Sequence, residues 1–105
     1  MSQPKDDLYF VRAGGYVKIG RTRNLRARLV SIQTGCPHPI SAVHYLKGQG
    51  DREREMHSRL AGHRANGEWF HWNRIVANVI RDQNPTDKRR MVKPAKVDAR
   101  LREQA

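Results

Sequence analysis

Two short β-prone segments near the amino terminus, separated by a pair of glycines, constrain the fold more than any other feature of the sequence. The first segment is Leu8–Val11, the glycines are Gly14 and Gly15, and the second segment is Tyr16–Gly20. Glycine tolerates the positive φ values that a tight turn between antiparallel strands requires. The sequence therefore predicts a β-hairpin at the start of the domain.

The segment after the hairpin has the capping residue and the apolar spacing of a helix. The Asn24 side chain can accept a hydrogen bond from a backbone amide of the first turn, and apolar residues then recur on one helical face: Leu25, Leu29 and Ile32. We expect this helix to run through Gln33 and to end at Gly35, where glycine would accept a left-handed conformation. The alternating run Ile40–Leu46 then predicts a third, half-buried strand.

The following segments predict two helices on either side of an aromatic segment. Asp51 is a candidate cap for a helix that runs to about His63. A turn then leads to the aromatic segment 68–72, which we expect to pack back on the core. Asn73 can cap a short final helix, whose apolar residues are Ile75, Val76, Val79 and Ile80.

Together these elements predict an α+β domain in which helices flank a small antiparallel sheet of about three strands. We place this domain at residues 6–82. The remaining segment, 83–105, contains two prolines and no aromatic residue, so it cannot build a core. We expect it to be a basic, flexible tail, and its densest charge is the run Lys88, Arg89 and Arg90.

The charge balance points to a nucleic acid as the partner. The 105 residues include 21 Lys and Arg against 10 Asp and Glu, which gives a formal net charge of +11 and a pI of about 10.9. Such a balance is the electrostatic signature of a nucleic-acid-binding domain. An anionic membrane surface or an acidic protein could also attract this charge. However, no segment combines a basic face with a broad aromatic and leucine face, and no apolar run has the length of a membrane span.

The cysteine and histidine content excludes further classes of protein. Cys36 is the single cysteine, so a disulfide framework and a four-cysteine zinc site are both excluded. The five histidines do not have the spacing of a structural zinc site. The first residues carry no apolar signal segment, and we expect an intracellular, cytoplasmic protein.

Residues on four of these elements resemble the GIY-YIG nuclease superfamily. Tyr9 lies in the predicted first strand, and Lys18, Ile19 and Gly20 end the second. An arginine, Arg28, stands eight residues past that glycine on the first helix. Glu53 lies on the next helix and has an apolar residue three positions later. This order of residues on elements of the expected type carries the resemblance.

Four longer segments are similar to one branch of that superfamily, the phage-type, Orf172-like DNA-binding domains. These segments are 17–22, 32–37, 53–57 and 67–70. The resemblance implies a phage-encoded protein that acts on DNA inside a bacterial host. One position departs from the superfamily pattern, because the second tyrosine of its name aligns with Lys18. Tyr16 lies two residues earlier on the same strand face and is an alternative substitute.

The resemblance also implies a chemistry: hydrolysis of a phosphodiester bond with one divalent metal ion, Mg²⁺ or Mn²⁺, and no small-molecule cofactor. It implies that Glu53 binds the metal ion. It also implies that Arg28 offsets the negative charge that develops on the phosphorane. Tyr9 or Lys18 would orient the attacking water or take its proton. His57 would contact phosphate or assist proton transfer. An exposed helix face laced with ion pairs would also explain Glu53 and His57.

Several basic residues are candidates for DNA contact. Three arginines crowd the loop and first helical turn after Gly20, namely Arg21, Arg23 and Arg26, and the tail adds Lys88, Arg89 and Arg90. For Glu68, anchoring of the adjacent aromatic turn competes with a direct role. Trp69 and Trp72 fit the core better than they fit a stacking platform for bases.

Two functions follow from the sequence, and they share one fold. The first is a metal-dependent DNA endonuclease, which the presence of Arg28 and Glu53 favours. The second is a DNA-binding module with weak or no cleavage, which Lys18 favours. A third and more distant interpretation is a basic protein that binds another protein. The oligomeric state does not follow from the sequence.

Overall fold

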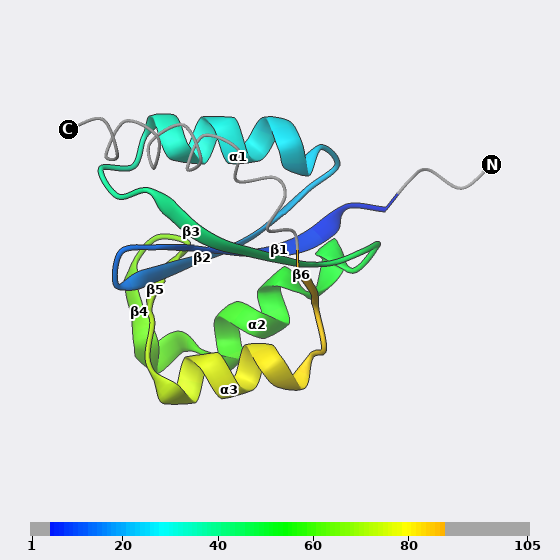
Figure 1. Ribbon diagram of the computed structural model, residues 1–105. Helices are drawn as coiled ribbons and strands as arrows, with labels where there is room; N and C mark the ends of the chain where they lie inside the picture. The colour runs from blue at the N-terminus through cyan, green and yellow to red at the C-terminus, as the bar shows by residue number, and fades with distance from the viewer. Residues whose placement is uncertain (1–4, 88–105) are drawn as a thin grey trace.

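The computed structural model describes residues 5–87, and these form one six-stranded antiparallel sheet with helices on both faces (Figure 1). The elements follow in the order β1 (Asp7–Ala13), β2 (Tyr16–Thr22), α1 (Leu25–Thr34), β3 (Ile40–Leu46), α2 (Glu53–Arg59), β4 (Arg64–Asn66), β5 (Trp69–His71), α3 (Arg74–Asp82) and β6 (Thr86–Asp87). Two short 3₁₀ turns, Gly50–Arg52 and Ala61–His63, flank α2. Among the described residues, no helix is long and apolar enough to cross a membrane.

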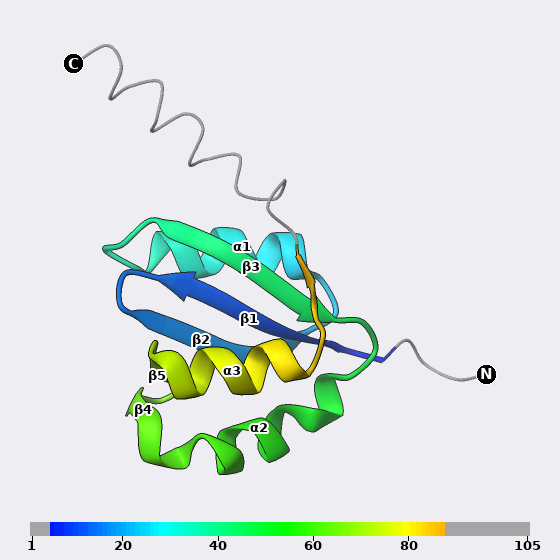
Figure 2. The same ribbon diagram turned by 60° about the horizontal axis from the view of Figure 1, so that its bottom comes forward.

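The strand order is β4-β5-β2-β1-β3-β6, with α1 on one face of the sheet and α2 and α3 on the other (Figures 1 and 2). The α+β class and the antiparallel sheet agree with the sequence-based prediction. The predicted number of about three strands was wrong. The additional strands β4, β5 and β6 have only two or three residues each, which is too short for alternation to be recognised.

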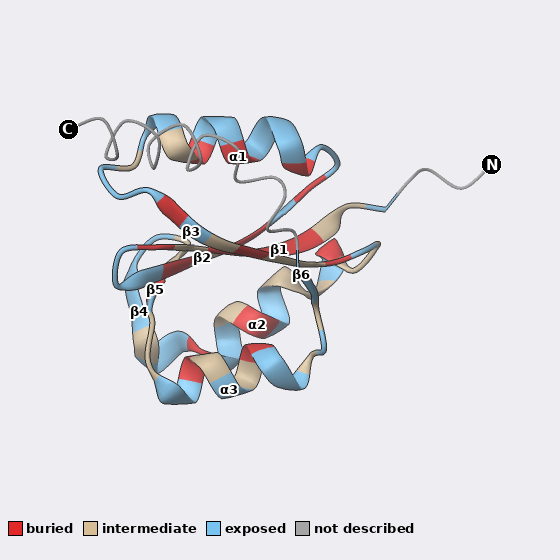
Figure 3. Cartoon of the chain, in the orientation of Figure 1, coloured by how far each residue is buried: buried red, intermediate tan, exposed pale blue. Residues whose placement is uncertain are grey.

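The predicted hairpin is confirmed. Strands β1 and β2 pair in register from Asp7↔Thr22 to Ala13↔Tyr16, and Gly14 in the turn has a φ of 60°. Strand β1 lies in the centre of the sheet and is buried on both faces. Figure 3 shows the buried residues concentrated in the central strands and on the helix surfaces that face them.

The core between α1 and the sheet follows the predicted helical face. It consists of Tyr9, Val11, Leu25, Leu29, Ile32, Ile40 and Val43. Asn24 caps α1 as expected, because its Oδ1 accepts a hydrogen bond of 3.0 Å from the Ala27 amide. The helix ends one residue later than predicted, at Thr34. Gly35 has a φ of −93°, so the expected left-handed conformation is absent there.

The core on the opposite face joins α2 and α3 to the sheet. It contains Leu8, Phe10, Val17, Ile19, Leu46, Met56, Leu60, Phe70, Val76 and Ile80. Asn73 caps α3 as predicted by accepting a hydrogen bond of 2.9 Å from the Val76 amide. Of the apolar residues on this helix, Ile75 lies outside the core and is 59% exposed.

Two expectations about the α2 region were wrong. Asp51 does not cap the helix, since it lies inside the 3₁₀ turn before α2, and the capping position is Arg52 without a side-chain hydrogen bond. The helix also ends at Arg59, and the expected extension to His63 is a separate 3₁₀ turn. A tight turn here redirects the chain into the short β4–β5 hairpin, which the sequence pattern did not indicate.

The chain after α3 continues the sheet. Strand β6 pairs with β3 through His44↔Asp87 and Tyr45↔Thr86, so regular pairing extends into the segment predicted as a tail. The basic run 88–90 lies outside the described residues.

Candidate active site at the open edge of strand β2

Strand β2 has two unlike halves, and the candidate site lies along the second. Strand β5 pairs with β2 only from Tyr16 to Lys18. Within residues 5–87, no strand pairs with Ile19–Thr22 on that side. The Ile19 amide donates a hydrogen bond of 3.0 Å to the Glu68 carbonyl oxygen. The Ile19 carbonyl oxygen lies 2.7 Å from Nε2 of His57. At Ile19, the β4–β5 turn and α2 therefore take the place of a neighbouring strand on this otherwise open edge.

The Tyr9 side chain crosses β2 directly above Gly20. These two residues are paired partners in the sheet, and Tyr9 is 1% exposed. A Cβ atom at position 20 would overlap the Tyr9 hydroxyl and would lie 2.6 Å from Cζ. Glycine is therefore required here because the phenol occupies the space of a side chain. This placement directs the hydroxyl group toward the open edge.

The electrostatic surroundings of Tyr9 identify the charged groups near its hydroxyl. The pKa of Tyr9 is raised to about 12, mainly by burial and also by the charges of Glu68 and Glu53, while the Arg28 guanidinium opposes this shift. These three charges come from α1, α2 and the β4–β5 turn. The phenol is therefore protonated at neutral pH and lies among charges from three separate segments.

The carboxyl groups of Glu53 and Glu68 form a close pair. Burial raises the pKa of Glu53, and the charge of Glu68 and a hydrogen bond with that carboxyl raise it as well. His57 and Arg21 act in the opposite direction. Two neighbouring carboxylates repel each other unless a proton or a cation lies between them. The pair therefore favours a shared proton or a cation.

Lys18 lies beside Glu68, and Tyr16 does not. The Lys18 Nζ atom is 3.8 Å from a Glu68 carboxylate oxygen and 5.5 Å from the centre of the Trp69 ring. Tyr16 shares the strand face with Lys18 but packs against His71, with a ring separation of 5.6 Å. Tyr16 lies four positions before Gly20 along the strand, a distance of about 13 Å.

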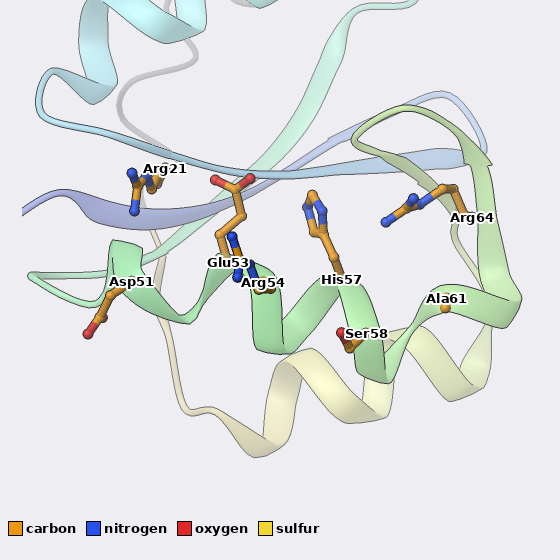
Figure 4. Close-up of a pocket in the computed structure, with 8 residues that line it drawn as sticks. All are labelled: Arg21, Asp51, Glu53, Arg54, His57, Ser58, Ala61 and Arg64. Atoms are coloured by element: carbon orange, nitrogen blue, oxygen red, sulfur yellow. The ribbon is translucent and has the colours of Figure 1, made fainter.

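A groove of about 740 Å³ runs between the β2 edge and α2 (Figure 4). Its lining consists of Arg21, Asp51, Glu53, Arg54, His57, Ser58, Ala61 and Arg64. Glu53 and His57 project into it from α2 toward β2, between Arg21 at one end and Arg64 at the other. The groove thus has carboxyl groups at Glu53 and Asp51, and arginines lie on either side of Glu53.

The arginines expected to bind DNA occupy different positions. Arg21 lines the groove and lies 3.5 Å from Asp6, whereas Arg23 pairs with the same carboxylate at 3.1 Å. Arg26 and Arg28 are exposed on α1, and Arg28 is close enough to affect the pKa of Tyr9. The candidates Lys88, Arg89 and Arg90 lie outside the described residues.

The donor atoms at the Glu53–Glu68 pair suit a hard cation. Among residues 5–87, no three His, Cys, Asp or Glu side chains lie together as a ready-made metal cage. Magnesium binds through one or two carboxylates and completes its coordination with water and substrate phosphate. Two carboxyl groups at a groove therefore fit magnesium, or the similar manganese ion.

Glu68 is a candidate site residue whose role the sequence left open between anchoring the aromatic turn and a direct contact. Its charge acts on both Tyr9 and Glu53, and its carboxylate pairs with Lys18. Nothing in its spacing indicates this, because the β4–β5 turn that places it is set by long-range pairing with β2. Its position in the 67–70 segment of the resemblance was the available signal.

The comparisons with known proteins give the family. A search of the curated proteins and a search of the solved structures each found no significant match. The family model described as the T5orf172 domain matches residues 5–84, which is well over half of the 105 residues. The chain therefore belongs to the T5orf172 domain family, a phage-associated family related to nuclease and DNA-binding domains.

Proposed function

We propose that the protein is a metal-dependent endonuclease that hydrolyses phosphodiester bonds of DNA with a GIY-YIG-type site. The observation that carries this proposal is the convergence of a buried tyrosine, an arginine and two carboxyl groups at the open edge of β2. The residues are Tyr9, Arg28, Glu53 and Glu68. They come from four separate segments, and a purely structural domain has no need to gather them beside a groove.

The carboxyl pair and the arginines divide the electrostatic task. Glu53 would hold the metal ion, with Glu68 as a second oxygen donor. A bound ion would supply Lewis-acid polarisation of the phosphoryl oxygens and neutralise charge there. Arg28 would offset the negative charge that develops on the phosphorane, and Arg21 would help to hold the substrate phosphate in the groove.

Three side chains would position the attacking water or exchange its proton. Tyr9 is protonated at neutral pH because its pKa is about 12, so it orients the attacking water through its hydroxyl group. Lys18 lies beside Glu68 and would position its carboxylate oxygen atoms through the N–H donors of its side chain. A carbonyl oxygen only accepts hydrogen bonds, so Nε2 of His57 must donate to Ile19. The atom of His57 that can exchange a proton is therefore Nδ1.

The test is nicking of supercoiled plasmid with Mg²⁺ or Mn²⁺, against an EDTA control. We expect metal-dependent nicking by the natural protein and its loss in Glu53→Gln and Arg28→Ala. Glu55→Ala is the matched control, because Glu55 lies on the same helix and pairs with Arg52 at 2.8 Å. Nicking that survives in Glu53→Gln would overturn the metal assignment.

A second candidate is a DNA-binding module without cleavage on the same fold. Two observations favour it: Lys18 stands in place of the second motif tyrosine, and the Tyr9 pKa of about 12 disfavours a phenolate. Tight plasmid binding by all variants with no nicking by any of them would establish this module.

A further inference from the structure

The groove contains two arginines that the proposed chemistry does not use. Arg54 lies on α2, Arg64 lies on β4, and both are exposed. Within residues 5–87, neither has an acidic partner, whereas Arg21, Arg23 and Arg52 each form an ion pair. An arginine without an acidic partner keeps all its donors for an external anion.

Phe70 supports two residues that line the groove, His57 and Arg64. Its ring is fully buried, the His57 ring lies 5.1 Å from it, and the Arg64 guanidinium lies 5.4 Å from its centre. A guanidinium stacked on an aromatic ring keeps its N–H edge available for hydrogen bonds. One core residue therefore holds both His57 and Arg64 toward the same groove.

The length of the groove suits a short stretch of one strand. The α2 helix from Glu53 to Arg59 rises about 9 Å at 1.5 Å per residue. At a rise of about 3.4 Å per nucleotide, this corresponds to about three nucleotides. Arg64 lies beyond that end, on the far side of Glu53 from Arg21 (Figure 4). A phosphodiester chain in the groove would therefore meet a cation on either side of the carboxyl group.

We propose that this groove binds the backbone of one DNA strand next to the cleaved bond, with Arg54 and Arg64 each contacting a phosphate of that short stretch. The inference deepens the proposed function by naming the surface that holds the substrate. It rests on the proposed function for the location of the cleaved bond, but the binding itself needs no cleavage.

The experiment measures binding of the full chain to a fluorescently labelled duplex and to a labelled single strand, in EDTA, over a range of salt. The variant is Arg54→Gln/Arg64→Gln. The matched control is Arg59→Gln/Arg74→Gln, which removes the same charge from exposed positions that do not line the groove. Circular dichroism confirms that both variants are folded.

We expect the groove variant to lose affinity for both DNAs. The slope of log K against log salt should fall in magnitude by about 1.8 for the duplex and about 1.4 for the single strand, because two phosphate contacts are lost. The control should change the slope less. Equal losses in the two variants, or a loss for the duplex alone, would overturn the proposal. The binding assay contains EDTA and no metal ion, so its result does not depend on whether the protein nicks DNA.

Discussion

The two halves of strand β2 have the same backbone conformation but different neighbours. From Tyr16 to Lys18 the strand pairs with β5, and the ladder is regular. At Ile19, a turn carbonyl and a histidine ring take the place of the neighbouring strand. An unpaired strand edge invites non-native pairing unless it is covered. Here the groups that cover the edge are the candidate site itself.

This difference indicates how a small domain can be rigid and still expose reactive groups. The paired half anchors β5 and its aromatic residues to the sheet. The open half leaves room for Tyr9, Glu53 and Glu68 to approach one another across the strand. The predictions below act on one half or the other, and the expected effects decrease in size.

Phe70→Ala should have the largest effect, because it breaks the paired half. The ring is fully buried opposite Val17, and removing a buried phenylalanine ring costs about 3–5 kcal/mol of unfolding free energy. Urea denaturation measures this loss, with Phe70→Leu as the milder comparison. A loss below about 1 kcal/mol would show that β5 is not docked as described.

Gly20→Ala should act on the open half. The added methyl group would overlap the Tyr9 hydroxyl, and a displacement of about 1 Å at a reacting group can cost about 10²-fold in rate. Plasmid nicking measures the effect. Gly15→Ala is the control, because a Cβ atom there meets nothing within 4 Å. An unchanged nicking rate in Gly20→Ala would exclude Tyr9 from the reaction.

Glu53→Gln should change how stability depends on pH. Because the pKa of Glu53 is raised in the folded protein, the folded state binds a proton more tightly than the unfolded state. Stability should therefore fall as pH rises from the unfolded pKa of about 4.5 through the folded pKa. The variant should lack this component, which we expect to be below about 1 kcal/mol because the carboxyl is partly exposed.

Thermal denaturation at a series of pH values, with and without Mg²⁺, measures this component. Magnesium should stabilise the natural protein near neutral pH and should not stabilise Glu53→Gln. Parallel profiles of stability against pH for the two proteins would argue against a raised pKa of Glu53 in the folded state.

Tyr16→Phe should have the smallest effect. The hydroxyl lies at the partly exposed, paired end of β2, and a surface change of this kind alters stability by less than about 0.5 kcal/mol. Nicking should be unchanged, whereas Lys18→Gln, which removes the ion pair with Glu68, should reduce it. Equal losses of nicking from both substitutions would assign the role of the second motif tyrosine to Tyr16.

Local signals in the sequence predicted much of the fold. The glycine turn, the Asn24 and Asn73 caps and the alternation of 40–46 depend on neighbouring residues, and the structure contains each of them. The β4–β5 hairpin and β6 were missed because strands of two or three residues depend on pairing with distant segments. Asp51 was wrongly assigned for a similar reason, since the chain enters α2 through a 3₁₀ turn.

The site was predictable only as far as the resemblance reached. Spacing alone could not show that Tyr9 would lie over Gly20, because that contact depends on strand register. The coupling of Glu68 to Glu53 and the position of Arg64 over Phe70 depend on how the β4–β5 hairpin docks. These interactions join segments far apart in the sequence, so no local pattern encodes them.

The hydrogen bonds of Ile19 have a consequence for the dynamics of the edge. One peptide segment of β2 is tied through its amide to the β4–β5 turn and through its carbonyl to α2. If the turn swings away to admit a substrate, the Ile19 amide becomes accessible to solvent deuterium. The exchange rate of this single proton therefore reports how often the turn leaves the strand, and bound DNA that holds the turn in place should slow it.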